Sequence, residues 1–184
     1  MEVIGKKVIQ KWVTKGYISE DEAEICLYNF ICSIFTLAVF CLLILAGTLL
    51  GECSNTIVLV TTTLFLRTYT NGYHCKSCAA CMILSLIVTL LSLHIIPILN
   101  LVTAWILMSV SSIIILMYAP TNSPQMHLSE DEIVAMRKHI RIRLLVLAVL
   151  FLLLLFFNIE KAYCIVMALT VVAASLLAVR YKVQ

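Results

Sequence analysis

Long apolar runs recur along the whole chain, and they constrain its fold more than any other feature. An apolar stretch of about 18 residues or more is typical of a helix that crosses a bilayer. Stretches of this kind are separated here by no soluble segment longer than about 30 residues. The runs predict six helical segments, at residues 19–50, 55–68, 77–96, 101–120, 129–157 and 162–181. We therefore expect an all-α, polytopic integral membrane protein.

The composition agrees with this prediction. The chain is 62% hydrophobic and 12% charged, with a mean hydropathy of +1.07, which leaves too little polar surface to cover a soluble domain of 184 residues. We expect a single membrane-embedded domain over residues 1–184. The first 22 residues carry charges throughout, unlike a signal peptide, so we expect the N-terminus to be retained. No nucleic-acid-binding signature is present.

The second segment is short for a membrane span. Residues 55–68 would rise about 21 Å as a helix, against roughly 30 Å of hydrocarbon. This segment would be re-entrant, partial or sheltered by its neighbours. The prediction is therefore four to six transmembrane or re-entrant helices.

The first 16 residues predict an amphipathic helix. Apolar residues such as Ile4, Val8 and Trp12 share one side of a helical wheel, whereas Lys7 and Lys11 lie mainly on the other. Such a helix is typical of the interface of a membrane that contains anionic lipid. The alternative is a solvated helix that precedes the first span.

Two identical capping boxes predict the starts of two long helices. The sequence Ser-Glu-Asp-Glu occurs at residues 19–22 and again at 129–132, each time before a long helical pattern. Between the fourth and fifth segments, residues 119–128 are expected to form a cytoplasmic loop.

The lysines and arginines predict the orientation. With a cytoplasmic N-terminus and six crossings, twelve of them lie inside and only Lys161 lies outside. We therefore expect a multi-pass protein of a bacterial cell membrane, with both termini and residues 67–81 at the cytoplasmic face.

Residues 67–81, "RTYTNGYHCKSCAAC", contain the candidate chemistry. Asn71 and Gly72 form a turn pair that should break the chain after the second segment. Ser77 can cap the next helix, and Cys81 would then lie about one turn inside it, where the helix N-terminus favours an anion. His74, in the loop just before, could accept the thiol proton and later protonate a leaving amine.

Other interpretations use the same side chains. His74, Cys75, Cys78 and Cys81 have a spacing compatible with zinc or an iron–sulfur cluster. Cys78 and Cys81 form a Cys-x-x-Cys pair that could transfer electrons, although the expected side is the reducing cytoplasm. Cys75 and Cys78 are also compatible with simple packing.

The same segment resembles the accessory gene regulator protein B (AgrB) family of membrane cysteine endopeptidases. The resemblance rests on Arg67, Gly72, His74 and Cys81 in the order R-x4-G-x-H-x6-C, in a chain of similar size and hydropathy. The sequence "YAPTNSPQ" at residues 118–125 is similar to the family's Ala-Pro loop. Two departures are Ser123, where a lysine is frequent, and Asn71, where a glycine is frequent.

The resemblance implies a reaction and roles for individual residues. Family members cleave a membrane-bound precursor peptide (AgrD-like) through a cysteine acyl-enzyme thioester, and the peptide then cyclises to a thiolactone or lactone pheromone. Cys81 would be the nucleophile and His74 the general base and acid, with Gly72 shaping the turn. Arg67 would hold a substrate carboxylate or stabilise the loop. The resemblance also suggests a homodimer, with no metal and no cofactor.

Ser85 is a further supporting candidate. It follows Cys81 by four residues on the same helix face, where it could orient His74 or the scissile carbonyl. The alternative is a hydroxyl that bonds back to its own helix.

Two other functions remain open from the sequence. One is a non-enzymatic membrane transport component, although the apolar runs hold no charged residue away from their ends. The other is a membrane thiol oxidoreductase that uses Cys78 and Cys81.

Overall fold

The chain is all-helical in the residues that the structure describes. The structure is a computed structural model, and it describes residues 2–19, 23–73, 78–121 and 129–182. Over these ranges it contains no strand, which confirms the predicted fold class. The elements are α1 (Glu2–Thr14), α2 (Ala23–Leu49), α3 (Cys53–Thr70), α4 (Cys78–Ile95), the 3-10 helix η1 (Ile96–Ile98), α5 (Leu101–Tyr118), α6 (Glu130–Phe157) and α7 (Ile159–Lys182).

The chain divides into two compact units, Met1–Leu42 and Leu43–Gln184. In the smaller unit, the rings of Trp12 and Phe30 meet edge to face, with 6.4 Å between their centroids. Ile9 is buried, whereas Lys11 is exposed. The predicted amphipathic helix is thus present as α1, and at Trp12 its apolar side packs on α2. Its predicted place at a membrane interface stays a prediction.

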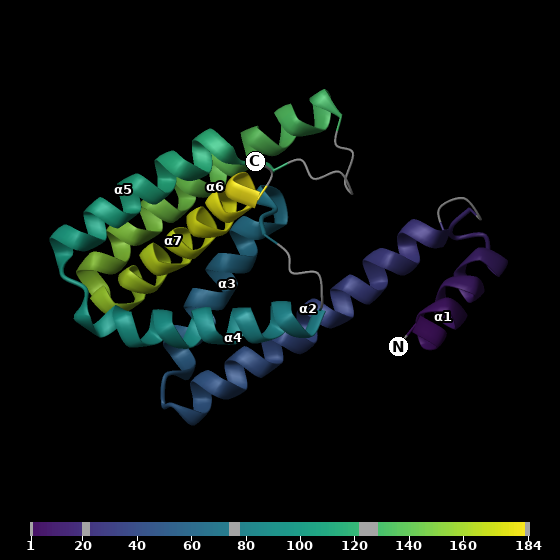
Figure 1. Ribbon diagram of the computed structural model, residues 1–184, viewed down its shortest axis with the longest axis horizontal. Coiled ribbons are helices and arrows are strands. Elements are labelled where there is room, and N and C mark those ends of the chain that lie inside the picture. The colour runs from purple at the N-terminus through teal and green to yellow at the C-terminus, as the bar shows by residue number, and fades with distance from the viewer. Residues whose placement is uncertain (1, 20–22, 74–77, 122–128, 183–184) are drawn as a thin grey trace. The chain divides into compact units, whose positions relative to one another are not determined.

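Helix α7 is the centre of the larger unit. It packs against α3, α4, α5 and α6, and Figure 1 shows α5, α6 and α7 running side by side. Every residue from 162 to 169 is buried. Ala162 and Ala168 are among them, and such small residues let helix backbones approach closely. Ala162 and Ala168 therefore allow neighbouring helices to approach α7 closely at these two positions.

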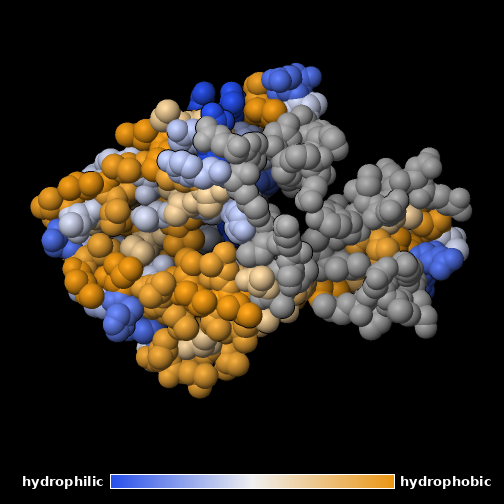
Figure 2. Space-filling view, viewed as in Figure 1, coloured by the Kyte–Doolittle hydropathy of each residue, from blue (hydrophilic) through white to orange (hydrophobic). Residues whose placement is uncertain are grey.

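Four of the helical segments described are long and apolar enough to cross a membrane. They are Ala80–Ile98, Leu101–Tyr118, Glu130–Phe157 and Ile159–Tyr181, with a shorter apolar stretch at Ile34–Leu49. Hydrophobic residues cover much of the face in Figure 2, and hydrophilic ones gather near the start of α6. Helix α3 is not among the four, in agreement with the weak second segment of the sequence. The number of spans falls within the predicted range of four to six.

Local capping chemistry sets the start of α6. The Ser129 side chain accepts a hydrogen bond from the Glu132 backbone N–H, and the Glu132 carboxylate accepts one from the Ser129 backbone N–H. These reciprocal bonds satisfy two N–H groups that the helix itself leaves unpaired, and they confirm the second predicted capping box. In the first box, Glu20, Asp21 and Glu22 lie outside the described residues.

Candidate active site

The candidate site begins where α3 ends, in a turn of unusual backbone conformation. Helix α3 ends at Thr70, and the next two residues have positive φ angles, 57° at Asn71 and 142° at Gly72. Asparagine tolerates the left-handed region better than most residues, and glycine has no Cβ to oppose it. The predicted break of the chain after the second segment is therefore confirmed.

Arg67 reaches over this turn from the last helical turn of α3. Its Nη2 donates a hydrogen bond of 2.9 Å to the carbonyl oxygen of Tyr73. That carbonyl belongs to the peptide group that joins Tyr73 to His74. Arg67 thus holds the backbone at the point where the chain enters His74, which favours the loop-stabilising role over the substrate-binding one.

A segment far along the sequence closes the turn from a second direction. The backbone N–H of Thr121 donates a hydrogen bond of 3.2 Å to the carbonyl of Thr70. The Asn71 side-chain amide donates another, also of 3.2 Å, to the carbonyl of Thr121. Thr70 is fully buried, and Ala119 is nearly so. Thr121 of the predicted loop therefore contacts the turn directly, whereas residues 122–128 lie outside the described ranges.

Helix α7 approaches the turn from a third direction. A Cβ atom added to Gly72 would lie 2.7 Å from the hydroxyl oxygen of Ser175 and 3.6 Å from Nη2 of Arg67. Real Cβ atoms essentially never come so close to another heavy atom as the first of these distances. Glycine is therefore required here by its positive φ and by the nearness of α7.

Cys81 lies at the start of the following helix. Helix α4 begins at Cys78, so Cys81 is in its first turn, where backbone N–H groups have no partner within the helix. The thiol is half-buried and is not in a disulfide. Ser85 lies one turn further along α4 and is also half-buried. This placement of Cys81 agrees with the sequence prediction.

Several predicted residues lie outside the described part of the chain. They are His74, Cys75, Lys76 and Ser77, together with the side chain of Cys78. The predicted contact between His74 and Cys81, the Ser77 cap, and the metal and redox interpretations all involve these residues. Each of them stays a prediction.

Helix α6 stabilises the end of α3 through a stack of cationic and aromatic groups. The Arg143 guanidinium lies 4.2 Å from the ring centroid of Phe65 and 4.0 Å from that of Tyr69. It also donates to the Phe65 carbonyl and the Thr68 hydroxyl. The ring of His139 lies 4.9 Å from that of Tyr69. A cation at a helix C-terminus is favourable, so Arg143 steadies the helix from which the turn emerges.

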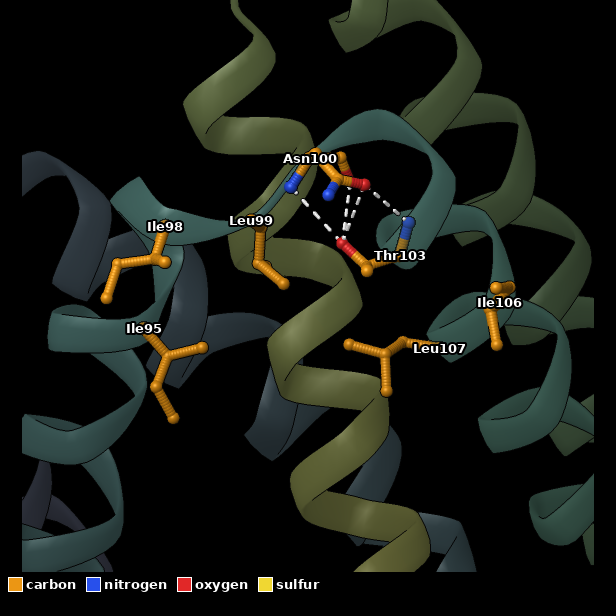
Figure 3. A pocket seen from close by; sticks show the side chains of 7 residues that line it. All are labelled: Ile95, Ile98, Leu99, Asn100, Thr103, Ile106 and Leu107. Atoms are coloured by element: carbon orange, nitrogen blue, oxygen red, sulfur yellow. Dashed lines mark hydrogen bonds between the residues drawn. The ribbon is translucent and has the colours of Figure 1, made fainter.

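A surface hollow of about 330 Å³ lies away from this site, at the corner between η1 and α5. Its lining consists of five aliphatic side chains with Asn100 and Thr103 (Figure 3). None of these side chains titrates or is a good nucleophile. Cys81 and Ile95 are 14 residues apart on α4, a rise of about 21 Å. This hollow is therefore not part of the candidate active site.

Comparison with known families shows which family the chain belongs to. The family described as Accessory gene regulator B (AgrB) matches residues 5–177, nearly the whole chain. The chain belongs to the AgrB family. No curated protein and no solved structure gives a significant match. Membership in the AgrB family is consistent with a role in processing quorum-sensing propeptides.

Sequence reasoning missed the partners of the turn in this AgrB family member. Thr121 and Ser175 are distant from the turn in sequence: Thr121 lies in the Ala-Pro loop at residues 118–125, and Ser175 belongs to no recognisable motif. One signal was available, because "AASLLA" at residues 173–178 is rich in small residues, which favour close helix contacts. That signal predicts that another segment packs closely against α7, but it does not identify that segment.

Proposed function

We propose that this protein is a membrane cysteine endopeptidase that cleaves an AgrD-like propeptide and allows its cyclisation. The observation that carries the proposal is the position of Cys81 in the first turn of α4, after a turn that Arg67 bonds at the peptide leading into His74. Membership in the AgrB family supports the substrate class. A thiol with a nearby imidazole is the minimum for nucleophilic cleavage of a peptide.

The proposed first step forms an acyl-enzyme. His74 accepts the proton of the Cys81 thiol as the sulfur attacks the scissile carbonyl carbon. The carbon–nitrogen bond then breaks, and His74 returns the proton to the leaving amine, so the C-terminal fragment departs. The N-terminal part of the propeptide remains as a thioester on Cys81. The N–H groups in the first turn of α4, which have no partner within the helix, favour the negative charge that develops there.

The proposed second step is cyclisation. A cysteine thiol or serine hydroxyl of the bound peptide attacks the thioester carbonyl, and Cys81 leaves as the thiol. Water would destroy the thioester by hydrolysis, so the site has to exclude water while the peptide group approaches. A site at the edge of a membrane domain suits this requirement.

The distribution of cationic residues supports a cytoplasmic active site. With a cytoplasmic N-terminus and six crossings, twelve lysines and arginines fall on the side that holds residues 67–81, and only Lys161 falls on the other. An amphipathic propeptide would lie in the same membrane interface as α1, which raises its local concentration near Cys81.

The decisive experiment is cleavage of a cognate propeptide by the full-length protein in liposomes. Cys81→Ser and His74→Ala are compared with the intact protein, and Cys78→Ser is the matched control three residues away. We expect Cys81→Ser to lower kcat by about 10⁴-fold, and Cys78→Ser to leave it nearly unchanged. Intact-mass spectrometry should detect a peptide adduct on the intact protein and none on Cys81→Ser.

Two outcomes contradict the proposal. Undiminished cleavage by Cys81→Ser would exclude that thiol as the nucleophile. Equal loss of activity in Cys78→Ser and Cys81→Ser would favour the oxidoreductase alternative, in which both thiols take part.

A further inference from the structure

Ser175 presents a small and fixed surface to the active-site turn. It lies on α7, half-buried, and its hydroxyl donates a 2.8 Å hydrogen bond to the carbonyl of Val172 in the same helix. Its oxygen is also the atom nearest to the missing Cβ of Gly72. At this contact between α7 and the turn, a serine therefore faces a glycine.

Helix α7 has little freedom to move away from this contact. Val172 and Leu176, on either side of Ser175, are fully buried, and α7 packs against four other helices. The turn is less enclosed, since Asn71, Gly72 and Tyr73 are all half-buried. If the side chain at position 175 became larger, the turn would yield before the helix does.

A displacement of the turn would reach the proposed catalytic base directly. Gly72 precedes His74 by only two residues, and Arg67 bonds the carbonyl of the intervening Tyr73. The same Nη2 of Arg67 lies 3.6 Å from the point that a Cβ on Gly72 would occupy. A larger group at position 175 would push on the turn and on the guanidinium that steadies it. Displacements of about 1 Å are enough to lower catalytic rates by about 10²-fold.

We propose that Ser175 is a positioning residue for the active site. Its small side chain lets the turn pack against α7, and this turn leads within two residues to His74, the proposed catalytic base. The inference rests on the proposed function for its role in catalysis. The steric contact between Ser175 and Gly72 is independent of it.

A size series at position 175 tests the proposal. Ser175→Ala, Ser175→Val and Ser175→Leu are prepared in the full-length protein, with Ala174→Leu as the matched control because Ala174 is adjacent but exposed. We expect Ser175→Ala and Ala174→Leu to stay within about twofold of the parent. Ser175→Leu should lower kcat by about 10²-fold with KM little changed, and Ser175→Val should fall between.

A second readout needs no propeptide. Iodoacetamide is added at neutral pH, and the label on Cys81 is quantified by peptide mass mapping. If the turn directs His74 toward Cys81, Ser175→Leu should slow the labelling of Cys81 to the rate seen in His74→Ala. Ala174→Leu should label like the parent, and labelling at Cys53, which lies at the start of α3, serves as an internal reference.

A double variant sharpens the test. Gly72→Ala should be severely impaired, and adding Ser175→Ala should recover part of the activity. The second substitution removes the Ser175 hydroxyl oxygen, which lies 2.7 Å from the new Cβ at position 72, and leaves the Cβ of residue 175 at 3.6 Å. Wild-type rates for Ser175→Leu in both readouts would overturn the proposal, as would equal activity of Gly72→Ala with and without Ser175→Ala. If the parent protein cuts no propeptide, the proposed function fails, while the labelling experiment still decides the role of Ser175.

Discussion

The two ends of α4 differ in how the chain is held there. At the Cys81 end, the preceding turn has two residues with positive φ and is bonded by Arg67, Asn71 and Thr121. At the Ile95 end, the chain passes through η1 to Asn100, whose side chain and Thr103 cap α5 reciprocally. Hydrogen bonds at the first end join distant segments, whereas the capping bonds at the second end join residues only three positions apart, although η1 also packs against α7.

This difference supports the placement of the proposed active site at the Cys81 end. A local cap forms wherever its few residues occur together, so it stabilises a helix without fixing that helix against others. The contacts of the turn do fix it against others, because Asn71 and Thr121 are 50 residues apart. Unusual backbone conformations persist only where the surrounding structure holds them, and they are concentrated at functional sites. The Cys81 end has this character, and the Ile95 end does not.

Among the variants that test this comparison, Arg67→Lys is expected to have the largest effect on activity. Arg67→Lys removes the guanidinium that bonds the Tyr73 carbonyl, and a hydrogen bond to a charged group contributes about 1.5–3 kcal/mol. We expect kcat for propeptide cleavage to fall by about 10- to 100-fold with KM nearly constant. Arg141→Lys, at an exposed position on α6, is the control and should behave like the parent. A rise in KM at constant kcat would show instead that Arg67 binds substrate.

A smaller effect is expected from Asn71. Asn71→Ala loses the bond to the Thr121 carbonyl and places alanine at a φ of 57°, which together should lower kcat by about 10-fold. Asn71→Gly loses only the bond, so we expect about a fivefold decrease. Steady-state cleavage by the two variants separates the two causes. Parent-like kinetics for both would mean that the turn does not need its link to Thr121.

The smallest effect on activity is expected at the other end of α4. Asn100→Ala removes the N-cap of α5 and should lower the free energy of unfolding by about 1 kcal/mol. Cleavage per folded molecule should stay at the parent level, because this end holds no residue of the proposed site. Thermal unfolding and cleavage are measured on the same sample. A loss of kcat as large as that of Asn71→Ala would show that the two ends of α4 do not differ in their importance for activity.

The sequence predicted the features that depend on neighbouring residues. Asparagine and glycine at positions 71 and 72 predicted the break after α3, and Ser129 with Glu132 predicted the start of α6. Apolar run length predicted the membrane helices and the weakness of α3 as a span. In each case the physical cause acts within a few residues or along one helix, so the local sequence contains the information.

The central position of α7 could not be predicted in this way. In a membrane, lipid is as apolar as the protein interior, so hydropathy does not tell a buried helix from an exposed one. Helix α5 is also strongly apolar, yet Leu101, Trp105 and Ile113 are exposed, whereas Ile165 and Leu169 of α7 are fully buried. The contacts of Thr121 and Ser175 with the turn depend on this packing, and for that reason they were missed.

The position of Ser175 in the chain has a consequence for biosynthesis. A ribosome makes Gly72 about a hundred residues before it makes Ser175, so the turn is synthesised long before the surface on which it rests. Until α7 enters the membrane and packs among its neighbours, the turn lacks its third support. The order of synthesis thus delays completion of the proposed active site until α7 is in place, and under the proposed function a nascent chain without α7 would be an inefficient peptidase.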